Sequence, residues 1–150
     1  MSRDRDQIHA FFEDPSTPLP VETPPLAKAL GGTLMRFDAG AKTLTMAFTP
    51  GEMFLQGNNV IQGGAVASML DLTCAFLGLG VVPAEKTIAT VTLNVSYLKG
   101  AKAGPHRVDA EIERQGRSHL FCRAALHPED DEQPTATASA VFSIFDARSG

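Results

Sequence analysis

The sequence predicts a single α+β domain in which a curled antiparallel sheet of about five or six strands wraps around one long buried helix. The helix is expected over residues 63–80, and its sequence, GGAVASMLDLTCAFLGLG, makes it apolar on nearly every side. A helix of that kind is buried inside a protein and does not lie on its surface. Before and after it, the sequence alternates with a period of two, as strands do. One sheet has to cover most sides of the helix, so the sheet must curl.

The strands are expected from alternating side chains and from the turn residues that separate them. Apolar side chains alternate with small or polar ones over residues 42–49, after an earlier strand that begins at Thr33. Four more strands are expected after the helix, over residues 87–98, 108–112, 118–127 and 135–145. In the first of these four, alternation places Thr90 on the face opposite to Val91 and Leu93. The turn residues between the strands favour antiparallel hairpins.

The first 25 residues are expected to form an arm and not a second domain. Residues 4–13 can form a short helix, and the prolines at positions 15, 18 and 20 then make a linker that lies on the surface. We therefore expect an N-terminal arm over residues 1–25 and one domain over residues 26–150.

Composition argues against several classes of protein. A net charge of −4 argues against a nucleic-acid partner, which usually requires a basic face. The charged N-terminus precedes no apolar h-region, and no uninterrupted apolar run reaches the roughly 18 residues of a membrane span, so we expect neither a secretory signal nor a membrane. Cys74 and Cys122 lie in apolar patterns without C-x-x-C spacing, which predicts buried reduced thiols and a cytoplasmic location. The four histidines are scattered, so no metal site is expected.

Asp71 is the first candidate for chemistry. It is the one charged side chain between Glu52 and Glu85, and it lies in the middle of the apolar helix. Burying a carboxylate without a partner costs several kcal/mol, so Asp71 needs either a partner or a task. One interpretation is structural, with Asp71 capping a loop or pairing with a distant Arg. The other is a carboxylate in a semi-apolar cleft that acts as a nucleophile or general base.

The start of the helix is the second candidate. Gln62, Gly63 and Gly64 stand where a helix presents free N–H groups and the positive end of its dipole. Glycine leaves these amides uncovered, as an oxyanion hole requires, although it also permits a sharp turn or close packing. Gln62 could donate a hydrogen bond to the same oxygen, or it could be an ordinary polar residue of the capping region.

The stretch NNVIQGGAVASMLD, residues 58–71, resembles the motif of the phenylacetate-pathway branch of hotdog thioesterases, which are related to 4-hydroxybenzoyl-CoA thioesterase. That motif reads Asn, a short spacer, His-Gly-Gly, and then Asp after six more residues. The segments ATVTLNVSYLK, residues 89–99, and GRS, residues 116–118, are also similar to the family. The resemblance covers about residues 30–146 and implies the hotdog fold, in which a curled sheet wraps around a central helix.

The resemblance implies an enzyme that hydrolyses acyl-CoA thioesters without a metal or redox cofactor, coenzyme A being part of the substrate. Asp71 matches the catalytic acid, which attacks the thioester or activates a water, and Gly63 matches the residue whose N–H polarises the thioester carbonyl. Thr90 falls where the family often has a Ser or Thr that positions the water or the acid. Gln62 stands where many relatives have His. The usual position of the upstream Asn falls on Gln56, while Asn58 and Asn59 lie nearer to the glycines.

Substrate binding is expected at further polar positions. These are Gly64, Asn58, Asn59, Lys99, Lys102, Arg117 and Ser118. The basic side chains among them lie near the ends of predicted strands, where they could meet the phosphates of coenzyme A. Ordinary solvated edge charges, which deter aggregation between sheets, are an equally good interpretation of any one of them. Two other functions stay open: a hotdog protein that binds acyl-CoA or a fatty acyl group without hydrolysing it, and a hotdog dehydratase, which normally needs a His beside the acid.

The spacing of the two candidates predicts a homo-oligomer, either a dimer or a dimer of dimers. Gly63 and Asp71 are eight residues apart, so one helix separates them by about 12 Å along its axis. A thioester carbonyl must lie about 3 Å from both its N–H donor and the attacking group. Two antiparallel helices related by a two-fold axis can meet both requirements, since the start of one then lies beside the middle of the other.

Overall fold

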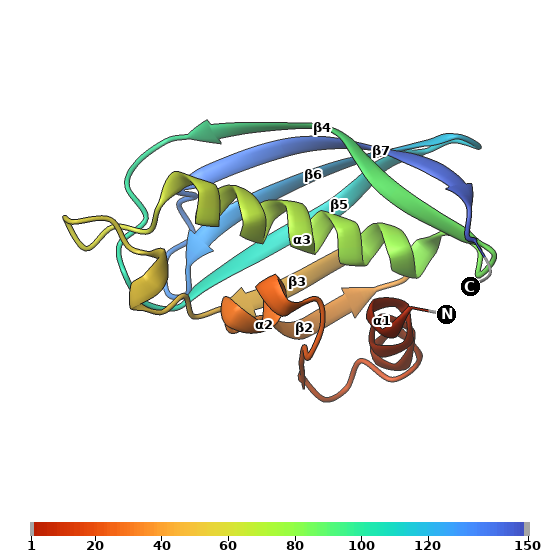
Figure 1. Cartoon of the computed structure of the whole chain (residues 1–150), viewed down its shortest axis with the longest axis horizontal. Helices are drawn as coiled ribbons and strands as arrows, with labels where there is room; N and C mark the ends of the chain where they lie inside the picture. Colours follow the sequence, from red (N-terminus) through yellow and green to blue (C-terminus); the bar gives the residue numbers. More distant parts are fainter. Residues whose placement is uncertain (1, 149–150) are drawn as a thin grey trace.

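The computed structural model describes residues 2–148 (Figure 1). The helices are α1 (Arg3–Glu13), α2 (Pro25–Ala29) and α3 (Gly63–Val81), with a short 3-10 helix, η1, at Glu52–Phe54. The strands are β1 (Leu19–Pro20), β2 (Thr33–Asp38), β3 (Thr43–Phe48), β4 (Lys86–Tyr97), β5 (His106–Gln115), β6 (His119–Pro128) and β7 (Ala136–Asp146).

All seven strands belong to one sheet, in the order β1-β2-β3-β5-β6-β7-β4. Every neighbouring pair is antiparallel. The sheet curves over α3, which lies along its concave face (Figure 1). The predicted sequence of two strands, a long helix and four strands is therefore confirmed. The additional strand, β1, has two residues and contains Pro20, which is tolerated there because β1 is at the edge of the sheet.

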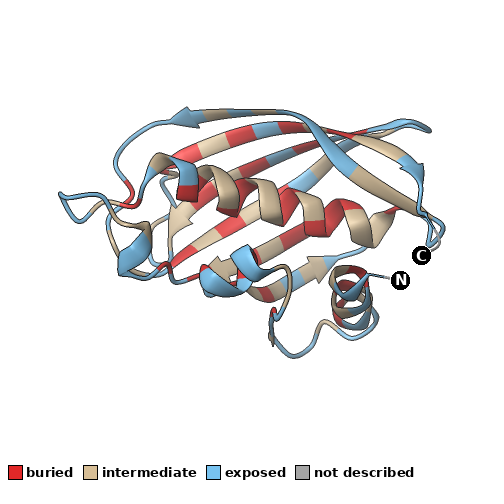
Figure 2. Cartoon of the chain, viewed as in Figure 1, coloured by how far each residue is buried: buried red, intermediate tan, exposed pale blue. Residues whose placement is uncertain are grey.

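The core forms between α3 and the inner face of the sheet, where the buried positions gather (Figure 2). Nine residues of α3 are buried: Ala65, Val66, Met69, Leu70, Thr73, Cys74, Phe76, Leu77 and Gly78. By length and a mean hydropathy of 1.7 the helix could cross a membrane, but half of its most apolar window is buried inside the protein, as in the core helix of a folded domain. Cys74 and Cys122 are both buried and free, as expected.

One face of α3 is not covered by the sheet. Five residues on it are only half-buried, and we call them the open strip: Ser68, Asp71, Leu72, Ala75 and Leu79. Their spacing places them within about 100° of the helix circumference, on one face. The expectation that the helix is buried on nearly every side is wrong for this face, because the sheet of one chain ends before it reaches the open strip.

Strand β4 forms the edge of the sheet and pairs only with β7. It has 12 residues, most of which are exposed along its length (Figure 2). Val91 and Tyr97 are each 54% exposed. A long edge strand with apolar exposed side chains is a template on which another strand can pair.

The N-terminal segment packs into the domain. Ile8 and Phe11 of α1 are fully buried in the common core, and the Arg5 side chain donates hydrogen bonds to the carbonyl oxygens of Pro83 and Lys86 at the far end of α3. Phe12 stacks on Phe37, with ring centroids 3.5 Å apart. The helix expected over residues 4–13 is therefore present, and its apolar face is part of the core.

Gly80, near the end of α3, allows α1 to pack closely, because a Cβ at this position would overlap the ring of Phe12. We predict that Gly80→Ala lowers the free energy of unfolding by about 1–3 kcal/mol, the usual effect of overpacking. Gly64→Ala serves as a control, since its Cβ would meet nothing within 4 Å. Denaturant titration measures both. In a Phe12→Ala background the cost of Gly80→Ala should largely disappear, and an undiminished cost would contradict the assigned contact.

Candidate active site

Asp71 lies on the open strip of α3, half-buried among apolar neighbours. Its Oδ1 accepts one hydrogen bond, from Thr90 Oγ1 on β4 at 3.1 Å. Burial raises the pKa of Asp71 above its ordinary value, and the Thr90 hydrogen bond partly opposes that rise. The described structure gives Asp71 no Arg or Lys partner within salt-bridge distance. The interpretation of Asp71 as one half of a structural ion pair within the chain is therefore wrong.

A β-bulge brings Thr90 to this side of the sheet. Thr90 pairs with Phe142 and Leu93 pairs with Ala140, and the register shifts between Thr90 and Thr92. Phe142 and Ala140 are both buried on the inner face of β7, and directly paired residues point to the same face. Simple alternation, which put Thr90 opposite to Leu93, is therefore wrong. The extra residue of the bulge turns the Thr90 hydroxyl toward α3, and re-aiming of this kind is common beside active sites.

The start of α3 presents free amides. Gln62 is the N-cap residue, and its carbonyl accepts hydrogen bonds from the amides of Ala65 and Val66, each at 3.0 Å. Its side chain forms no cap hydrogen bond, so Gln62 is the N-cap residue by its position and backbone alone. Within residues 2–148 the amides of Gly63 and Gly64 donate to no protein acceptor. Both N–H groups are therefore available to donate hydrogen bonds to an incoming carbonyl oxygen.

In the loop before α3, Asn58 and Asn59 have a different place from Gln56. Asn59 has a φ of 60°, its amide donates to Gln56 O at 3.1 Å, and its carbonyl accepts from Ala103 N at 3.1 Å. Asn is one of the few residues that adopt this left-handed conformation easily, so Asn59 shapes the turn, with Asn58 exposed beside it. Gln56 instead lines a cavity of about 210 Å³ together with Gly63 and Tyr97. Motif spacing pointed to Gln56. Tyr97 lies in the segment 89–99 that resembles the family, but it is not among the predicted site residues.

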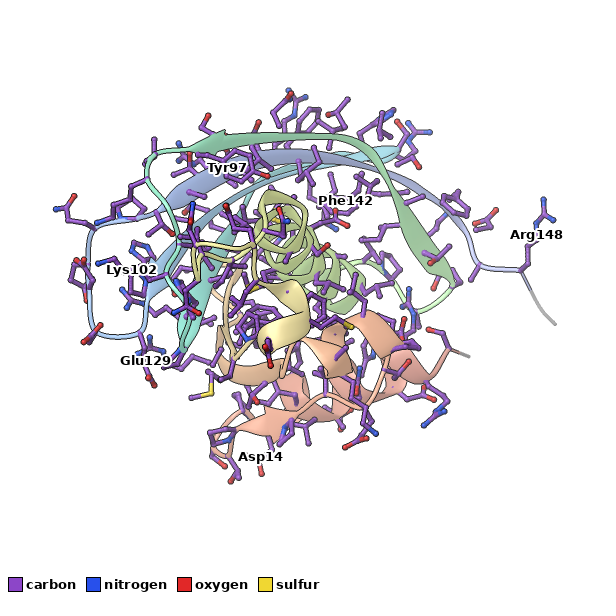
Figure 3. The ribbon with its side chains drawn as sticks, turned by 60° about the vertical axis from the view of Figure 1, so that its left-hand side comes forward. Asp14, Tyr97, Lys102, Glu129, Phe142 and Arg148 are labelled. Carbon is purple, nitrogen blue, oxygen red and sulfur yellow. The ribbon has the colours of Figure 1, made fainter. Side chains whose placement is uncertain are left out.

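The candidate phosphate-binding residues form two separate groups. Lys99 and Lys102 line a cavity of about 520 Å³ near Glu129, and Lys102 and Glu129 lie on the same side of the molecule (Figure 3). Lys99 is also 3.7 Å from Asp131. Lys99 and Lys102 come before the first residue of β5, whereas Arg117 and Ser118 come after its last residue. The ten residues of β5 span about 30 Å. One chain therefore does not gather these residues around one ligand.

The described residues hold no group of three His, Cys, Asp or Glu side chains placed as metal ligands. The polar groups near α3 include one carboxylate with a hydroxyl partner, two free amides and two glutamines. These groups suit polarisation of a carbonyl and attack by a carboxylate or a water.

Comparison with known proteins identifies the family. The family model described as Thioesterase superfamily matches residues 58–135, just over half of the chain, including the start of α3, Asp71 and Thr90. The chain belongs to the thioesterase superfamily. As a superfamily member it is an enzyme, and the predictions of a thioesterase and of the hotdog fold are confirmed.

Three known proteins show how far the similarity extends. A phenylacetic acid degradation-related protein from Ralstonia eutropha JMP134 is 31% identical, with a TM-score of 0.77 over 82% of this thioesterase and 92% of that chain. A thioesterase from Pseudomonas aeruginosa has a TM-score of 0.76 at 18% identity, over 98% of this chain and 97% of that one. The medium/long-chain acyl-CoA thioesterase YigI of Salmonella typhimurium is 24% identical over 133 residues, which are 80% of this chain and 85% of YigI.

The raised pKa of Asp71 makes a prediction about stability. A carboxyl group whose pKa is higher in the folded state contributes stability at low pH and loses it as the pH rises through the folded value. Asp71→Asn should therefore unfold at a higher temperature than the wild type near neutral pH. The difference should shrink as the pH falls toward 3.8, the ordinary value for Asp.

Asp14 provides a matched control, since it is exposed and lies at the lower edge of the molecule in Figure 3. The Ser16 hydroxyl and amide lower the pKa of Asp14, so Asp14→Asn should change stability in the opposite direction. Melting curves of both variants across the acid range measure the effect. An Asp71→Asn variant that is less stable than the wild type at neutral pH would show that the carboxylate is structurally satisfied.

Proposed function

We propose that this thioesterase hydrolyses acyl-CoA, and that its carboxylate is Asp71. The observation that carries the proposal is the half-buried Asp71 on an apolar helix, with a raised pKa and one hydroxyl partner. Desolvation of this kind makes a carboxylate a stronger base and nucleophile than it is in water. The acyl-CoA substrate is supported by the similarity to YigI. The proposed chemistry requires neither a metal nor a redox cofactor. On sequence grounds we propose that the protein is cytoplasmic.

In the proposed reaction, the thioester oxygen accepts hydrogen bonds from Gly63 N–H at the start of α3. Negative charge that develops on this oxygen is stabilised by the amide and by the positive end of the helix dipole. Asp71 either attacks the carbonyl carbon or removes a proton from a water that does so. If Asp71 attacks, breaking of the C–S bond expels the thiolate and leaves a mixed anhydride on Asp71, which a water then hydrolyses to the free acid. If Asp71 acts as a base, the hydroxide from the water adds to the carbonyl carbon and the C–S bond breaks to give the free acid. In both routes one water is consumed, and its proton ends on the thiolate, so that coenzyme A leaves as the thiol. Thr90 holds the Asp71 carboxylate in position, and Gln62 supplies a second donor to the oxygen.

We infer that two chains share each site. Asp71 and the start of α3 are both tied to the free edge strand, Asp71 through Thr90 and Gly63 through Tyr97, whose hydroxyl is 2.6 Å from Gly63 O. If two copies of β4 pair antiparallel about an axis midway between Thr90 and Tyr97, the Tyr97 end of one strand meets the Thr90 end of the other. Gly63 of one chain then approaches Asp71 of the second chain. Such a dimer also pairs the exposed edge of β4 and covers the open strip.

A binding protein without hydrolytic activity is the competing function, and Asp71→Asn separates the two. We predict that this variant lowers turnover of acyl-CoA by about 100-fold or more, the usual effect of losing a positioned acid–base group or nucleophile. Release of free thiol from a panel of acyl-CoAs gives the rate, and calorimetry gives the affinity. Turnover within a few-fold of the wild type, in a folded variant, would exclude Asp71 as the catalytic carboxylate.

Hybrid dimers test the shared site. Gly63→Pro deletes the amide at the first position of α3, where Pro is tolerated, and the extended backbone of Gln62, with φ −55° and ψ 141°, suits a following Pro. Asp71→Asn and Gly63→Pro chains should each be inactive alone. After unfolding and refolding together, roughly half of the dimers are hybrids with one intact site each, so about a quarter of wild-type activity should return.

Gly63→Ala keeps the amide, and its Cβ would lie 3.4 Å from the Tyr97 ring, so it measures how much of the loss in Gly63→Pro comes from adding a side chain at this position and not from deleting the amide. Mass spectrometry counts the hybrids. Hybrids that form at the expected frequency and stay inactive would mean that the site lies within one chain.

A further inference from the structure

Tyr97 contacts the start of α3 in a way that the proposed reaction has not used. It is the last residue of β4, and its hydroxyl donates a hydrogen bond to Gly63 O at 2.6 Å. The ring also packs beside Gly63, 3.4 Å from the position of a Cβ there. Because this tyrosine is 54% exposed, its burial contributes little to the core. It is labelled at the upper side of the molecule in Figure 3.

The carbonyl that accepts this bond belongs to the same peptide group as the amide of Gly64. A hydrogen bond to a peptide oxygen polarises the group and makes its N–H a stronger donor. Gly64 N–H donates to no protein acceptor within residues 2–148, and Gly64 is an exposed residue. The preceding peptide group is polarised in the same way, because Gln62 O accepts from Ala65 N and Val66 N. The amides of Gly63 and Gly64 are therefore both stronger hydrogen-bond donors, because the carbonyl of each peptide group itself accepts a hydrogen bond.

We propose that the oxyanion site has two backbone N–H donors, Gly63 and Gly64, beside the Gln62 side chain, and that Tyr97 is a positioning residue that orients and polarises the Gly64 amide. The inference rests on the proposed function, since it assumes that the thioester oxygen binds at the start of α3. The Tyr97 hydroxyl does not touch the substrate. It fixes the plane of the peptide between Gly63 and Gly64, so that the Gly64 N–H meets the oxygen as negative charge develops on it.

The substitution Tyr97→Phe removes only the hydroxyl. Gly63 O keeps its helical hydrogen bond from the amide four residues later, so no buried carbonyl is left without a partner and the melting temperature should hardly change. Since both amides remain, the loss of kcat should be smaller than the loss caused by deleting one N–H donor. We expect kcat to fall about tenfold with KM nearly constant.

Ser68→Ala is the matched control on the same turn of the helix. Ser68 Oγ donates to Gly64 O at 2.9 Å, which polarises the peptide group of Ala65 N–H. That N–H is already bonded to Gln62 O at 3.0 Å and cannot reach a substrate. Removal of this hydroxyl should therefore leave kcat within twofold or so of the wild type, although it changes the same helix turn by one hydrogen bond.

Two unreactive analogues separate a role at the carbonyl oxygen from a general effect on binding. An acyl-CoA ketone keeps the carbonyl oxygen, whereas an acyl-CoA thioether lacks it. Tyr97→Phe should weaken binding of the ketone several-fold and leave binding of the thioether unchanged. Because the chain has one tyrosine and no tryptophan, tyrosine fluorescence of the wild type reports on Tyr97 alone. The ketone should change this fluorescence more than the thioether does.

The outcomes distinguish failure of this inference from failure of the proposed function. Wild-type kcat in Tyr97→Phe, together with an inactive Asp71→Asn variant, would overturn the role of Tyr97 and leave the proposed function intact. Equal losses of ketone and thioether affinity would also overturn it, since the hydroxyl would then serve binding in general. If Asp71→Asn is as active as the wild type, the proposed function fails first. The ketone and thioether affinities still report directly whether a carbonyl binds beside Tyr97.

Discussion

The rigid spacing of α3 is the constraint on which the rest of the molecule depends. A helix fixes Gly63 and Asp71 about 12 Å apart, and no side-chain rotation in one chain can bring a carboxylate back to the amides at its own helix start. The fold can hold a free helix N-terminus and a desolvated carboxylate on the same apolar helix because the two never neutralise each other within the chain. Asp71 instead has one weak partner, Thr90, which holds the carboxylate without removing its charge.

The sheet supports this arrangement through its edge. Strand β4 contacts Asp71 through Thr90 and the start of α3 through Tyr97, so one strand contacts both halves of the proposed site. The bulge between Thr90 and Thr92 is what makes this possible. Without the extra residue, either Thr90 or the Leu93–Tyr97 segment would face away from the helix. The local loss of regular pairing is tolerated because β4 is an edge strand and interrupts only its ladder with β7.

The sequence predicts the fold well because its main signals are local. Apolar residues over positions 63–80 mark α3, and alternation marks β3 and the strands after the helix, whose positions are confirmed to within a few residues. The family motif likewise points to Asp71 and Gly63. Alternation fails at Thr90, because a bulge depends on the register with β7, about 50 residues later. The contact between Tyr97 and Gly63 joins residues 34 positions apart, and no local pattern encodes it. Nor does sequence spacing reveal that Arg117 lies far from Lys99, because that separation depends on the direction of β5.

Three features of the isolated chain are incomplete on the same side of the molecule. Within the described residues, the outer edge of β4 has no strand partner, and the sheet does not cover the open strip of α3. Among these residues, Asp71 also has no free amide nearby that could polarise the carbonyl it would act on. Each would be costly or useless if it remained alone, since an exposed edge aggregates and a half-solvated carboxylate is a weaker base. Antiparallel pairing of two β4 strands resolves all three at once. In the dimer that we propose, such pairing would extend the sheet, bury the strip and bring the Gly63 and Gly64 amides of one chain beside Asp71 of the second chain. Assembly and catalysis then depend on the same strand, so a substitution in β4 that weakens pairing should reduce activity in proportion to the loss of dimer.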